Sequence, residues 1–230
     1  MGNWGGMVSD QILIPYADSM LTRIPSSLDI HKAVSVSDNL SDAWRTVFPL
    51  LSADSNQGVC ILGGGAKSIG LFAAGLAVAL GSPNVIYIDF DSSRLNIAER
   101  YGAHCIQVDK SPKFGSLKLH NLPSFRIGIE ATSSIAGFNF LFDHIECGGT
   151  VYGVGFYFFV EEPIQYFTMY GKSLTLKVGV SHPGFDAKRL IKFLCDSEFD
   201  PRIVYSEIHD YSDAHKIYGK PFNKLILIRD

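Results

Sequence analysis

From residue 59 onward, short apolar runs alternate with longer segments whose apolar positions recur at helical spacing. Short apolar runs that end near glycine or a polar residue are typical of buried strands. The expected strands are residues 59–62, 84–89, 105–108, 125–131, 150–154 and 174–180. The expected helices are 69–80, 92–102, 137–146, 163–170 and 186–196. This alternation predicts an α/β fold with a doubly wound, six-stranded parallel sheet.

The two ends of the chain do not follow this alternation. Residues 11–16 and 21–25 are expected to be extended, and residues 203–208 and 224–228 are expected to be strands. A helix over 41–51, with Asp38 or Ser41 as its N-cap, connects the parts. We therefore predict a sheet domain over 41–196 and a smaller unit built from 1–40 and 197–230.

The first strand is followed by the turn GGGAKSIG, residues 63–70. A phosphate site at such a turn needs exposed backbone N–H groups, glycine where the phosphate approaches, and an acid after the second strand. Gly63, Gly64 and Gly65 supply the turn, Gly70 lets the helix approach the sheet, and Asp89 can bind ribose hydroxyls. The pattern favours a dinucleotide site; a tight strand-to-helix turn without a ligand is the alternative.

Lys67 departs from the G-x-G-x-x-G pattern. When the last glycine of that pattern is placed at Gly70, its middle glycine falls on Lys67. The side chain either blocks the pyrophosphate or turns outward and adds a positive charge beside it. We favour the outward orientation, because Ser68 and the glycines still leave several N–H groups for an anion.

Charge at the second strand bears on the choice of cofactor. Asp89 would repel a 2′-phosphate, so NAD is favoured over NADP unless Arg94 or Arg100 compensates. Arg94 is expected either at the adenosine side of the site or as a solvated helix arginine paired with Asp91 or Glu99.

Composition narrows the remaining possibilities. A chain of 230 residues with 47% hydrophobic content is long enough for one large or two small cored domains. The net charge of −3 and the scattered basic residues give no reason to expect a nucleic-acid or membrane partner. No signal-peptide or membrane-span pattern is visible, which predicts a cytoplasmic location. The four cysteines are far apart and are expected to be reduced core residues.

Several motifs together resemble a known family. They are GGMVSDQILIPYADSMLTRIPSSL, SVSDNLSDAW, GGGAKSIGLFAA, IDFDSSRLNIAERYGA and GIEATSS followed by FDHIECGGTVYGVG. Their order and spacing are similar to the C-terminal two-thirds of medium-chain, zinc-type alcohol dehydrogenases. The resemblance implies a Rossmann domain, a β-rich remnant of the family's catalytic GroES-like domain at the chain ends, and hydride transfer between nicotinamide and a small alcohol or aldehyde.

The resemblance also implies site residues. The expected cofactor contacts are Gly63, Gly65, Lys67, Ser68, Ile69, Gly70, Asp89, Arg94, Ala131, Thr132, Val154 and Gly155. Asp38 matches the third zinc ligand of the formaldehyde and polyol dehydrogenase subset, and Asp42 stands where a threonine usually lies beside the nicotinamide. For Asp38 the alternative is a helix N-cap or a solvated loop acid.

No metal is expected in this chain alone. The family's N-terminal third, which carries the other zinc ligands, has no counterpart before Met1, and a catalytic zinc usually needs three protein ligands. His182, His209 and His215 are scattered and are expected to be surface or packing residues.

Three functions stay open at this point. The first is an NAD-dependent oxidoreductase, completed where needed by a separate N-terminal chain. The second is a non-catalytic NAD(H)-binding protein. Under both, residues 174–180 are expected to pair with a second copy in a homodimer. The third is an S-adenosylmethionine-dependent methyltransferase, against which the end segments argue; the absence of a Tyr-x-x-x-Lys pair argues against a short-chain dehydrogenase.

Overall fold

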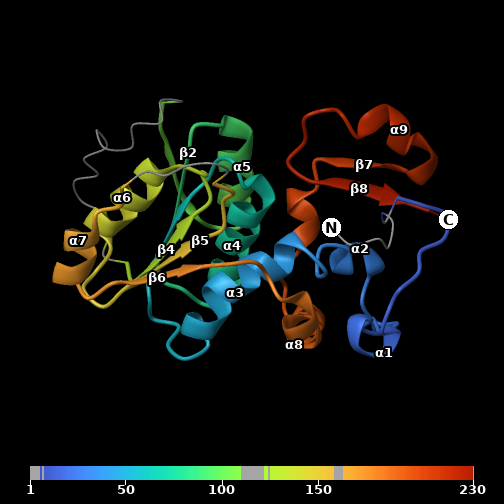
Figure 1. The fold of residues 1–230 in the computed structure, drawn as a ribbon, viewed down its shortest axis with the longest axis horizontal. Helices are drawn as coiled ribbons and strands as arrows, with labels where there is room; N and C mark the ends of the chain where they lie inside the picture. Colours follow the sequence, from blue (N-terminus) through green and yellow to red (C-terminus); the bar gives the residue numbers. More distant parts are fainter. Residues whose placement is uncertain (1–5, 7, 110–121, 124, 158–162, 230) are drawn as a thin grey trace.

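The fold is built around one parallel sheet (Figure 1). The computed structural model describes residues 6, 8–109, 122–123, 125–157 and 163–229. Six strands follow the order β3-β2-β1-β4-β5-β6 and are all paired in parallel. They are β1 (Val59–Leu62), β2 (Val85–Asp89), β3 (His104–Gln107), β4 (Ile127–Glu130), β5 (Thr150–Gly153) and β6 (Thr175–Val178). The predicted doubly wound α/β fold is confirmed.

The strand register positions the candidate site. Leu62, at the end of β1, pairs with Ile88 on β2 and with Glu130 on β4, so the carboxyl ends of the three strands lie level. The strand order reverses between β1 and β4. Open parallel sheets bind ligands in the crevice at such a reversal, outside the carboxyl ends of the strands.

Helices cover both faces of the sheet (Figure 1). One face packs against α3 (Asn39–Leu51), α4 (Lys67–Ala79) and α5 (Ser92–Arg100), and α8 (Pro183–Asp196) packs on α3. The other face packs against α6 (Ile135–His144), with α7 (Tyr166–Gly171) beside it. Alternate residues of the central strands enter the two cores, which explains why these strands are apolar without interruption.

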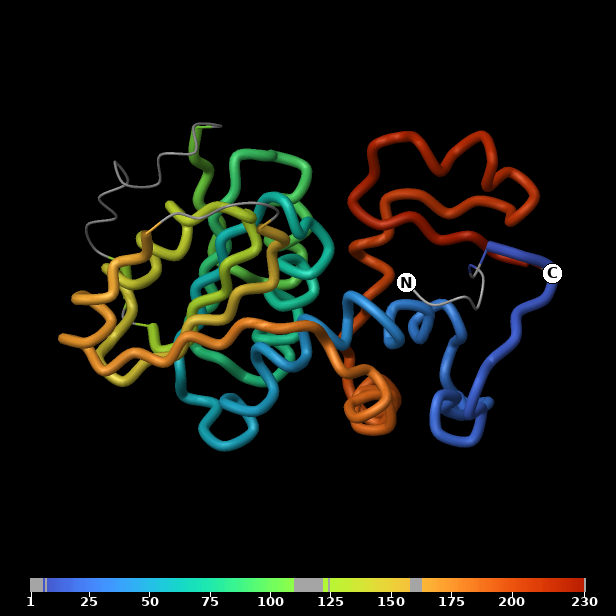
Figure 2. The backbone as a smooth tube through the Cα atoms, in the orientation of Figure 1, coloured from blue at the N-terminus to red at the C-terminus, as the bar shows by residue number. Residues whose placement is uncertain are grey.

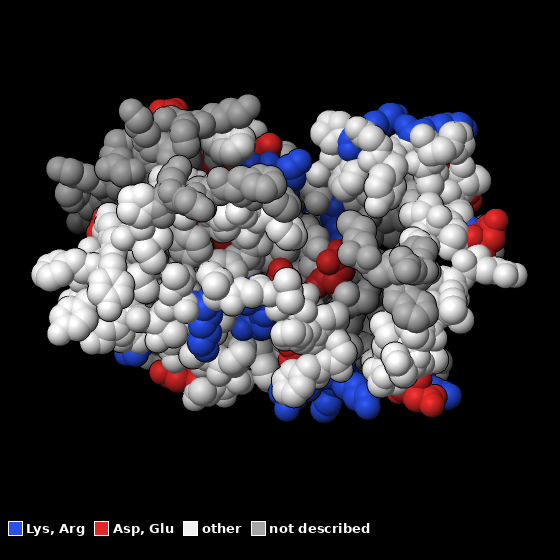
Figure 3. Space-filling view, viewed as in Figure 1, with Lys and Arg blue, Asp and Glu red and all other residues white. Residues whose placement is uncertain are grey.

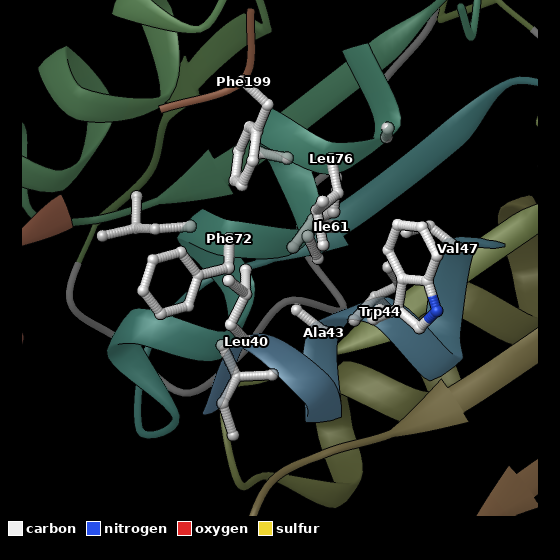
Figure 4. Packing of buried hydrophobic residues seen from close by; sticks show 14 of the residues in the cluster. Leu40, Ala43, Trp44, Val47, Ile61, Phe72, Leu76 and Phe199 are labelled. Atoms are coloured by element: carbon white, nitrogen blue, oxygen red, sulfur yellow. The ribbon is translucent and has the colours of Figure 1, made fainter. Parts of the chain in front are cut away.

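The small residues of α4 allow it to approach its neighbours closely. Trp44 of α3 and Phe72 of α4 are fully buried in the core shared by α3, α4 and β1 (Figure 4). A Cβ atom at Gly70 would lie 3.3 Å from the Cβ of Ala131, and one at Gly75 would lie 2.7 Å from the ring of Phe199. The approach of α4 to the sheet therefore depends on Gly70, and its approach to Phe199 depends on Gly75.

The chain ends form a smaller part of the molecule. Its elements are α1 (Ala17–Met20), α2 (Ile30–Ala33), η2 (Pro201–Val204), β7 (Glu207–Asp210), η3 (Tyr211–Asp213), α9 (Ala214–Ile217) and β8 (Leu225–Ile228). Strands β7 and β8 pair in parallel, and the N-terminal segment lies beside them (Figure 2), where Asp10 forms an ion pair of 3.0 Å with Arg229.

Two local predictions need correction here. The strand expected over 203–208 begins only at Glu207, because Pro201 opens a 3₁₀ turn capped by the side chain of Asp200. Helix α3 begins at Asn39; Asp38 holds the N-cap position without a side-chain capping bond, and the hydroxyl of Ser41 donates instead to the Val36 carbonyl.

Other expectations concern the surface of the molecule. Cys60 is buried and Cys105 half-buried, but Cys147 and Cys195 are exposed, so the prediction of core cysteines was wrong for the last two. Of the polar loop expected over 110–123, only 122 and 123 are among the described residues. Within the described part of the chain, no helix has the length and apolar character needed to cross a membrane.

Candidate functional site

A pocket of about 470 Å³ lies at the carboxyl edge of the sheet. The first turn of α3, Ile69 of α4 and the segments that follow β5 and β6 form its walls. It brings together five residues predicted from the sequence, which are Asp38, Asp42, Ile69, Val154 and Gly155. Acidic atoms are also visible in the hollow between the sheet and the β7–β8 part (Figure 3). The pocket has mostly apolar walls with carboxylates on one side.

Asp42 is held in place by Arg45. The Arg45 Nε lies 2.5 Å from Asp42 Oδ1, and its Nη2 donates to the Gly179 carbonyl at 2.7 Å. Arg45 therefore connects α3 to the segment after β6. Burial raises the pKa of Asp42, and the guanidinium of Arg45 opposes this effect.

Asp38 lies at the exposed edge of the pocket. Lys224, which precedes β8, donates to its carboxylate at 3.2 Å. With the Asn39 amide nitrogen facing Asp38, that nitrogen lies 2.8 and 2.6 Å from the two carboxylate oxygens, and the amide oxygen accepts from the Ser68 hydroxyl at 2.5 Å. Asn39 thus connects the pocket to the first turn of α4. The sequence reasoning missed it, although it directly follows Asp38.

The glycine turn is anchored on the end of β4. The N–H of Gly65 donates to Thr132 O at 3.3 Å, and that of Ala66 donates to Ala131 O at 2.8 Å. A Cβ atom at Gly64 would lie 2.9 Å from the Cα of Thr132, so the backbones meet too closely for a side chain. Helix α4 begins at Lys67, directly after Ala66. The N–H groups of a first helical turn lack partners within the helix. These groups are suited to binding an anion.

The side chain of Lys67 is turned outward from this turn. Its Nζ donates to the Phe222 carbonyl at 3.2 Å, in the loop before β8. The ammonium group therefore lies beside the start of α4 without filling it, which is one of the two orientations considered from the sequence.

Asp89 is enclosed by its neighbours. Its Oδ1 accepts from Arg94 Nη2 at 2.6 Å and from the Asp91 N–H at 3.0 Å, and its Oδ2 accepts from Arg94 Nε at 2.7 Å and from the Tyr87 hydroxyl at 3.0 Å. The residue is 0% exposed. In this arrangement the carboxylate has no atom to offer a ribose.

Arg94 is not the solvated helix arginine that was one alternative from the sequence. It is 3% exposed and forms a two-bond ion pair with Asp89, with a longer contact of 3.4 Å to Asp91. Asp91 caps α5 through the N–H groups of Ser93 and Arg94, which turns Arg94 back over the end of β2. Its guanidinium also lies 5.0 Å from the centre of the Phe90 ring.

Glu130 is a candidate that the sequence reasoning missed. It ends β4 and is fully buried; the Thr132 N–H donates to its Oε1 at 2.8 Å, the Thr132 hydroxyl also donates to it, and the Tyr157 hydroxyl donates to Oε2. Burial raises the pKa of Glu130 to about 7, although hydrogen bonds from residues 132–134 act in the other direction. An acid at the end of an apolar strand was the signal available in the sequence.

The predicted site residues thus fall into three places. Lys67, Ser68 and Gly70 lie in the first turn of α4, after Gly63 and Gly65, while Ala131 and Thr132 anchor the glycine turn. Asp89 and Arg94 are paired with each other beyond it. None of His182, His209 and His215 lines the pocket. In the described part of the chain, no three His, Cys, Asp or Glu side chains group as a metal ion would require.

Comparisons with known proteins agree on one family, although no family model matches the chain. The chain is 32% identical over 116 residues to a glutathione-independent formaldehyde dehydrogenase of Bacillus subtilis strain 168, covering 50% of this chain and 28% of that protein. It is 24% identical over 219 residues to a Mycobacterium tuberculosis protein described as a zinc-binding alcohol dehydrogenase, covering 95% of this chain and 56% of that protein. The chain thus spans only part of these relatives.

Solved structures support the fold. An alcohol dehydrogenase of Thermus sp. ATN1 superposes with a TM-score of 0.84 at 23% identity, covering 97% of this chain and 65% of the other. A protein of Escherichia coli CFT073 described as a short chain alcohol dehydrogenase, in complex with NADH, gives a TM-score of 0.74 at 18% identity, covering 90% of this chain and 61% of the other. A Sinorhizobium meliloti 1021 protein described as a zinc-binding dehydrogenase, bound to NADP, gives 0.75 at 21%, covering 90% and 62%.

The sequence motifs, the strand order and these matches lead to the same assignment. The curated relatives are alcohol, formaldehyde and threonine dehydrogenases, and the strand order is that of a dinucleotide-binding sheet. The chain is similar to medium-chain, zinc-type alcohol dehydrogenases and corresponds to the C-terminal part of these longer proteins.

Proposed function

We propose that this chain is the dinucleotide-binding part of an oxidoreductase that transfers hydride between a small alcohol or aldehyde and a nicotinamide cofactor. The observation that carries the proposal is the pocket at the carboxyl edge of the sheet, beside the first turn of α4. The turn offers N–H groups and Lys67 to a pyrophosphate, and Ile69, Val154 and Gly155 offer an apolar surface to a nicotinamide ring. The cofactor, when bound, supplies the hydride chemistry.

NAD is the proposed cofactor, with NADP the weaker alternative. Arg94 is the basic residue at the end of β2, but its Nε and Nη2 are bound to Asp89 and its Nη1 contacts Asp91. A guanidinium already occupied by two carboxylates is a poor receptor for a 2′-phosphate. The preference for NAD is therefore supported by the occupied guanidinium of Arg94, and not by the direct repulsion between Asp89 and a 2′-phosphate that the sequence suggested.

Polar groups on the α3 side of the pocket are proposed to contact the substrate. Asp38 and Asp42 line this side, and Asp38 stands at the position of a family zinc ligand. This chain alone is proposed to hold no zinc, because one carboxylate does not make a catalytic site.

Residues 8–34 of the smaller part expose many apolar side chains, among them Val8, Leu13 and Tyr16. Such surfaces mark interaction sites, which supports a further polypeptide segment over this region.

Titration with NADH and NADPH, followed by nicotinamide fluorescence, tests the proposal. We expect NADH binding with a Kd on the order of micromolar and weaker binding of NADPH. Lys67→Met should weaken NADH binding roughly 3- to 10-fold through loss of a charge beside the pyrophosphate. Lys192→Met on α8, where Lys192 pairs with Asp196, is the matched control. Absence of NADH binding by the parent chain would overturn the proposal.

A second candidate function is a non-catalytic NAD(H)-binding homodimer. The observation in its favour is that β6 is an edge strand, with Val178 69% exposed and with Phe167 of α7, 85% exposed, beside it. An exposed apolar strand edge is suited to pairing with a second copy around a twofold axis. Turnover of any small alcohol or aldehyde with NAD distinguishes the enzyme from this candidate.

Light scattering tests the dimer. The parent chain should have twice the mass of the 25.3-kDa monomer. Phe167→Glu should shift the population to monomer, whereas Phe185→Glu, at another highly exposed phenylalanine on α8, should not. A monomeric parent chain contradicts this proposal and leaves the oxidoreductase proposal intact.

A further inference from the structure

Among the described residues, a buried carboxylate without a cationic partner, that of Glu130, is bonded to the pocket-lining residue Tyr157. Asp42 is paired with Arg45 and Asp38 with Lys224. The Glu130 carboxylate instead accepts hydrogen bonds from neutral groups, which are the Tyr157 hydroxyl, the Thr132 hydroxyl and backbone N–H groups of residues 132–134. Glu130 is fully buried directly behind the pocket wall. An uncompensated buried carboxylate responds strongly to any positive charge that arrives nearby, because the interior screens charges weakly.

Tyr157 connects this carboxylate to the pocket. It lines the pocket, its hydroxyl donates to Glu130 Oε2, and its ring stacks on Phe138, another lining residue, at 5.3 Å between ring centres. The Phe156 N–H donates to the Ser133 hydroxyl at 3.2 Å, which fixes the same segment to the end of β4. The Tyr157 hydroxyl is therefore a fixed bridge between the pocket wall and Glu130.

Among the described residues, Glu130 forms no ion pair. In the neighbouring strands its pairing partners are Leu62 of β1 and Gly153 of β5. Helix α6 presents Gly137, where a Cβ atom would lie 2.6 Å from Glu130 Oε1. Tyr157 is the titratable side chain bonded to it. The ionisation of Glu130 is consequently set by burial, by hydrogen bonds and by whatever occupies the pocket.

We propose that Glu130, acting through Tyr157, is the proton acceptor of this pocket, ionised beside an oxidised nicotinamide ring and protonated beside a reduced one. The inference rests on the proposed function. The oxidised ring carries a positive charge that favours the carboxylate, and the reduced ring is neutral. In alcohol oxidation, hydride leaves the carbinol carbon for the ring. The hydroxyl proton passes to the Tyr157 oxygen while the Tyr157 proton passes to Glu130 Oε2, which leaves a carbonyl product and a neutral carboxyl.

Binding alone tests this assignment. We would measure the Kd of NAD⁺ and of NADH for the purified chain between pH 5.5 and pH 8.5. The two ligands share their adenosine and pyrophosphate, so the ratio of their Kd values isolates the effect of the ring. In the parent chain the preference for NAD⁺ should grow on the order of tenfold as pH rises through 7, since the oxidised ring favours the ionised carboxyl. In Glu130→Gln the ratio should stay constant.

Two further variants identify the group. Glu146→Gln, the same substitution just after α6, should keep the pH dependence of the parent chain. Tyr157→Phe removes a hydrogen bond to the ionised carboxylate, so the midpoint of the pH dependence should move upward. A role of Tyr157 in packing alone would weaken both ligands equally without moving the midpoint.

The outcomes separate this inference from the proposed function. A ratio that does not change with pH in the parent chain, or that changes equally in Glu130→Gln, overturns the inference while dinucleotide binding stands. Failure of both ligands to bind overturns both proposals. If Glu130→Gln does not fold, calorimetry of the parent chain at pH 7 in two buffers of different ionisation enthalpy measures the protons released on binding. Release with NAD⁺ and not with NADH, together with the Tyr157→Phe shift, supports the assignment. Equal release with the two ligands overturns it.

Discussion

Two buried carboxylates, Asp89 and Glu130, end the strands β2 and β4 on either side of β1. Their neighbours differ, so the two groups differ in how their charge is compensated. Asp89 is compensated by a two-bond ion pair with Arg94, whereas Glu130 is held only by hydrogen bonds from neutral groups. A paired buried charge is costly to break, and an unpaired one is costly to ionise. At the scale of single residues, the two sites therefore respond differently to substitution and to pH.

Removal of the cation at the end of β2 should be strongly destabilising. Arg94→Met leaves the Asp89 carboxylate buried without a partner, which should lower the free energy of unfolding by roughly 3–5 kcal/mol in a urea titration. Adding Asp89→Asn to Arg94→Met should restore part of the loss, because the uncompensated charge is removed. A loss below about 1 kcal/mol for Arg94→Met would show that the pair is solvated in solution.

Ionisation of Glu130 should make stability fall with rising pH. Its pKa in the folded chain is about 7, above the ordinary value of 4.5, so the folded state holds its proton more tightly than the unfolded state. This contribution is fully present below pH 4.5 and is lost as pH rises through 7, by roughly 3 kcal/mol in total. Glu130→Gln should therefore gain stability relative to the parent chain between pH 4.5 and pH 8. A difference between the two proteins that is independent of pH contradicts this prediction.

Sequence reasoning located the candidate site residues better than it described their contacts. The glycine turn, Asp38 and Asp42 follow from local spacing, and the pocket does include the two acids. The closure of Asp89 by Arg94 was not predictable, because it depends on how Asp91 caps α5 and turns that helix toward the strand. Glu130 was missed because its bridge to Tyr157 joins residues 27 positions apart.

At the scale of elements, glycines and small side chains govern how the layers pack. Strand β1 matched its prediction, and β2 and α4 came within two residues of theirs, since apolar runs and glycines mark their limits in the sequence. Strand β7 was placed too early because the run that begins at Ile203 looks apolar and extended, while Pro201 and the cap from Asp200 make a 3₁₀ turn there. The pattern of apolar residues alone does not reveal such a cap.

Two helix glycines should respond in opposite directions to alanine. A Cβ atom at Gly75 of α4 would lie 2.7 Å from Phe199 and 2.8 Å from Tyr101, whereas at Gly184 of α8 no atom lies within 4 Å. Gly75→Ala should destabilise by roughly 1–3 kcal/mol through overpacking. Gly184→Ala should stabilise by up to about 1 kcal/mol through helix propensity. Thermal unfolding measures both; equal effects would mean that α4 moves freely enough to accommodate the methyl group.

At the scale of the whole molecule, lysines connect the nucleotide turn to the C-terminal part. Lys67 at the start of α4 donates to the Phe222 carbonyl, and Lys224 donates to Asp38 at the pocket edge. Both contacts join the starts of α3 and α4 to the loop that precedes β8. An anion bound at the first turn of α4 would compete with Phe222 for the Lys67 ammonium, so ligand binding and the order of the C-terminal part are linked.

Hydrogen exchange measures this linkage. Lys67→Met should increase the exchange of amides in β7 and β8, while Lys192→Met on the outer surface of α8 should not. Adding NADH to the parent chain should increase exchange in the same strands. Unchanged protection in Lys67→Met would show that the Phe222 contact does not hold this part in place.

The group that accepts the hydrogen bond from Lys67 is the main-chain carbonyl of Phe222, not a side chain. Every amino acid supplies that oxygen, so side-chain replacement at position 222 preserves the contact as long as the loop keeps its path. Replacement at position 67 abolishes it with any residue that lacks a long cationic side chain. This one contact is thus determined almost entirely by the residue at position 67, and the side chain at position 222 is free to vary.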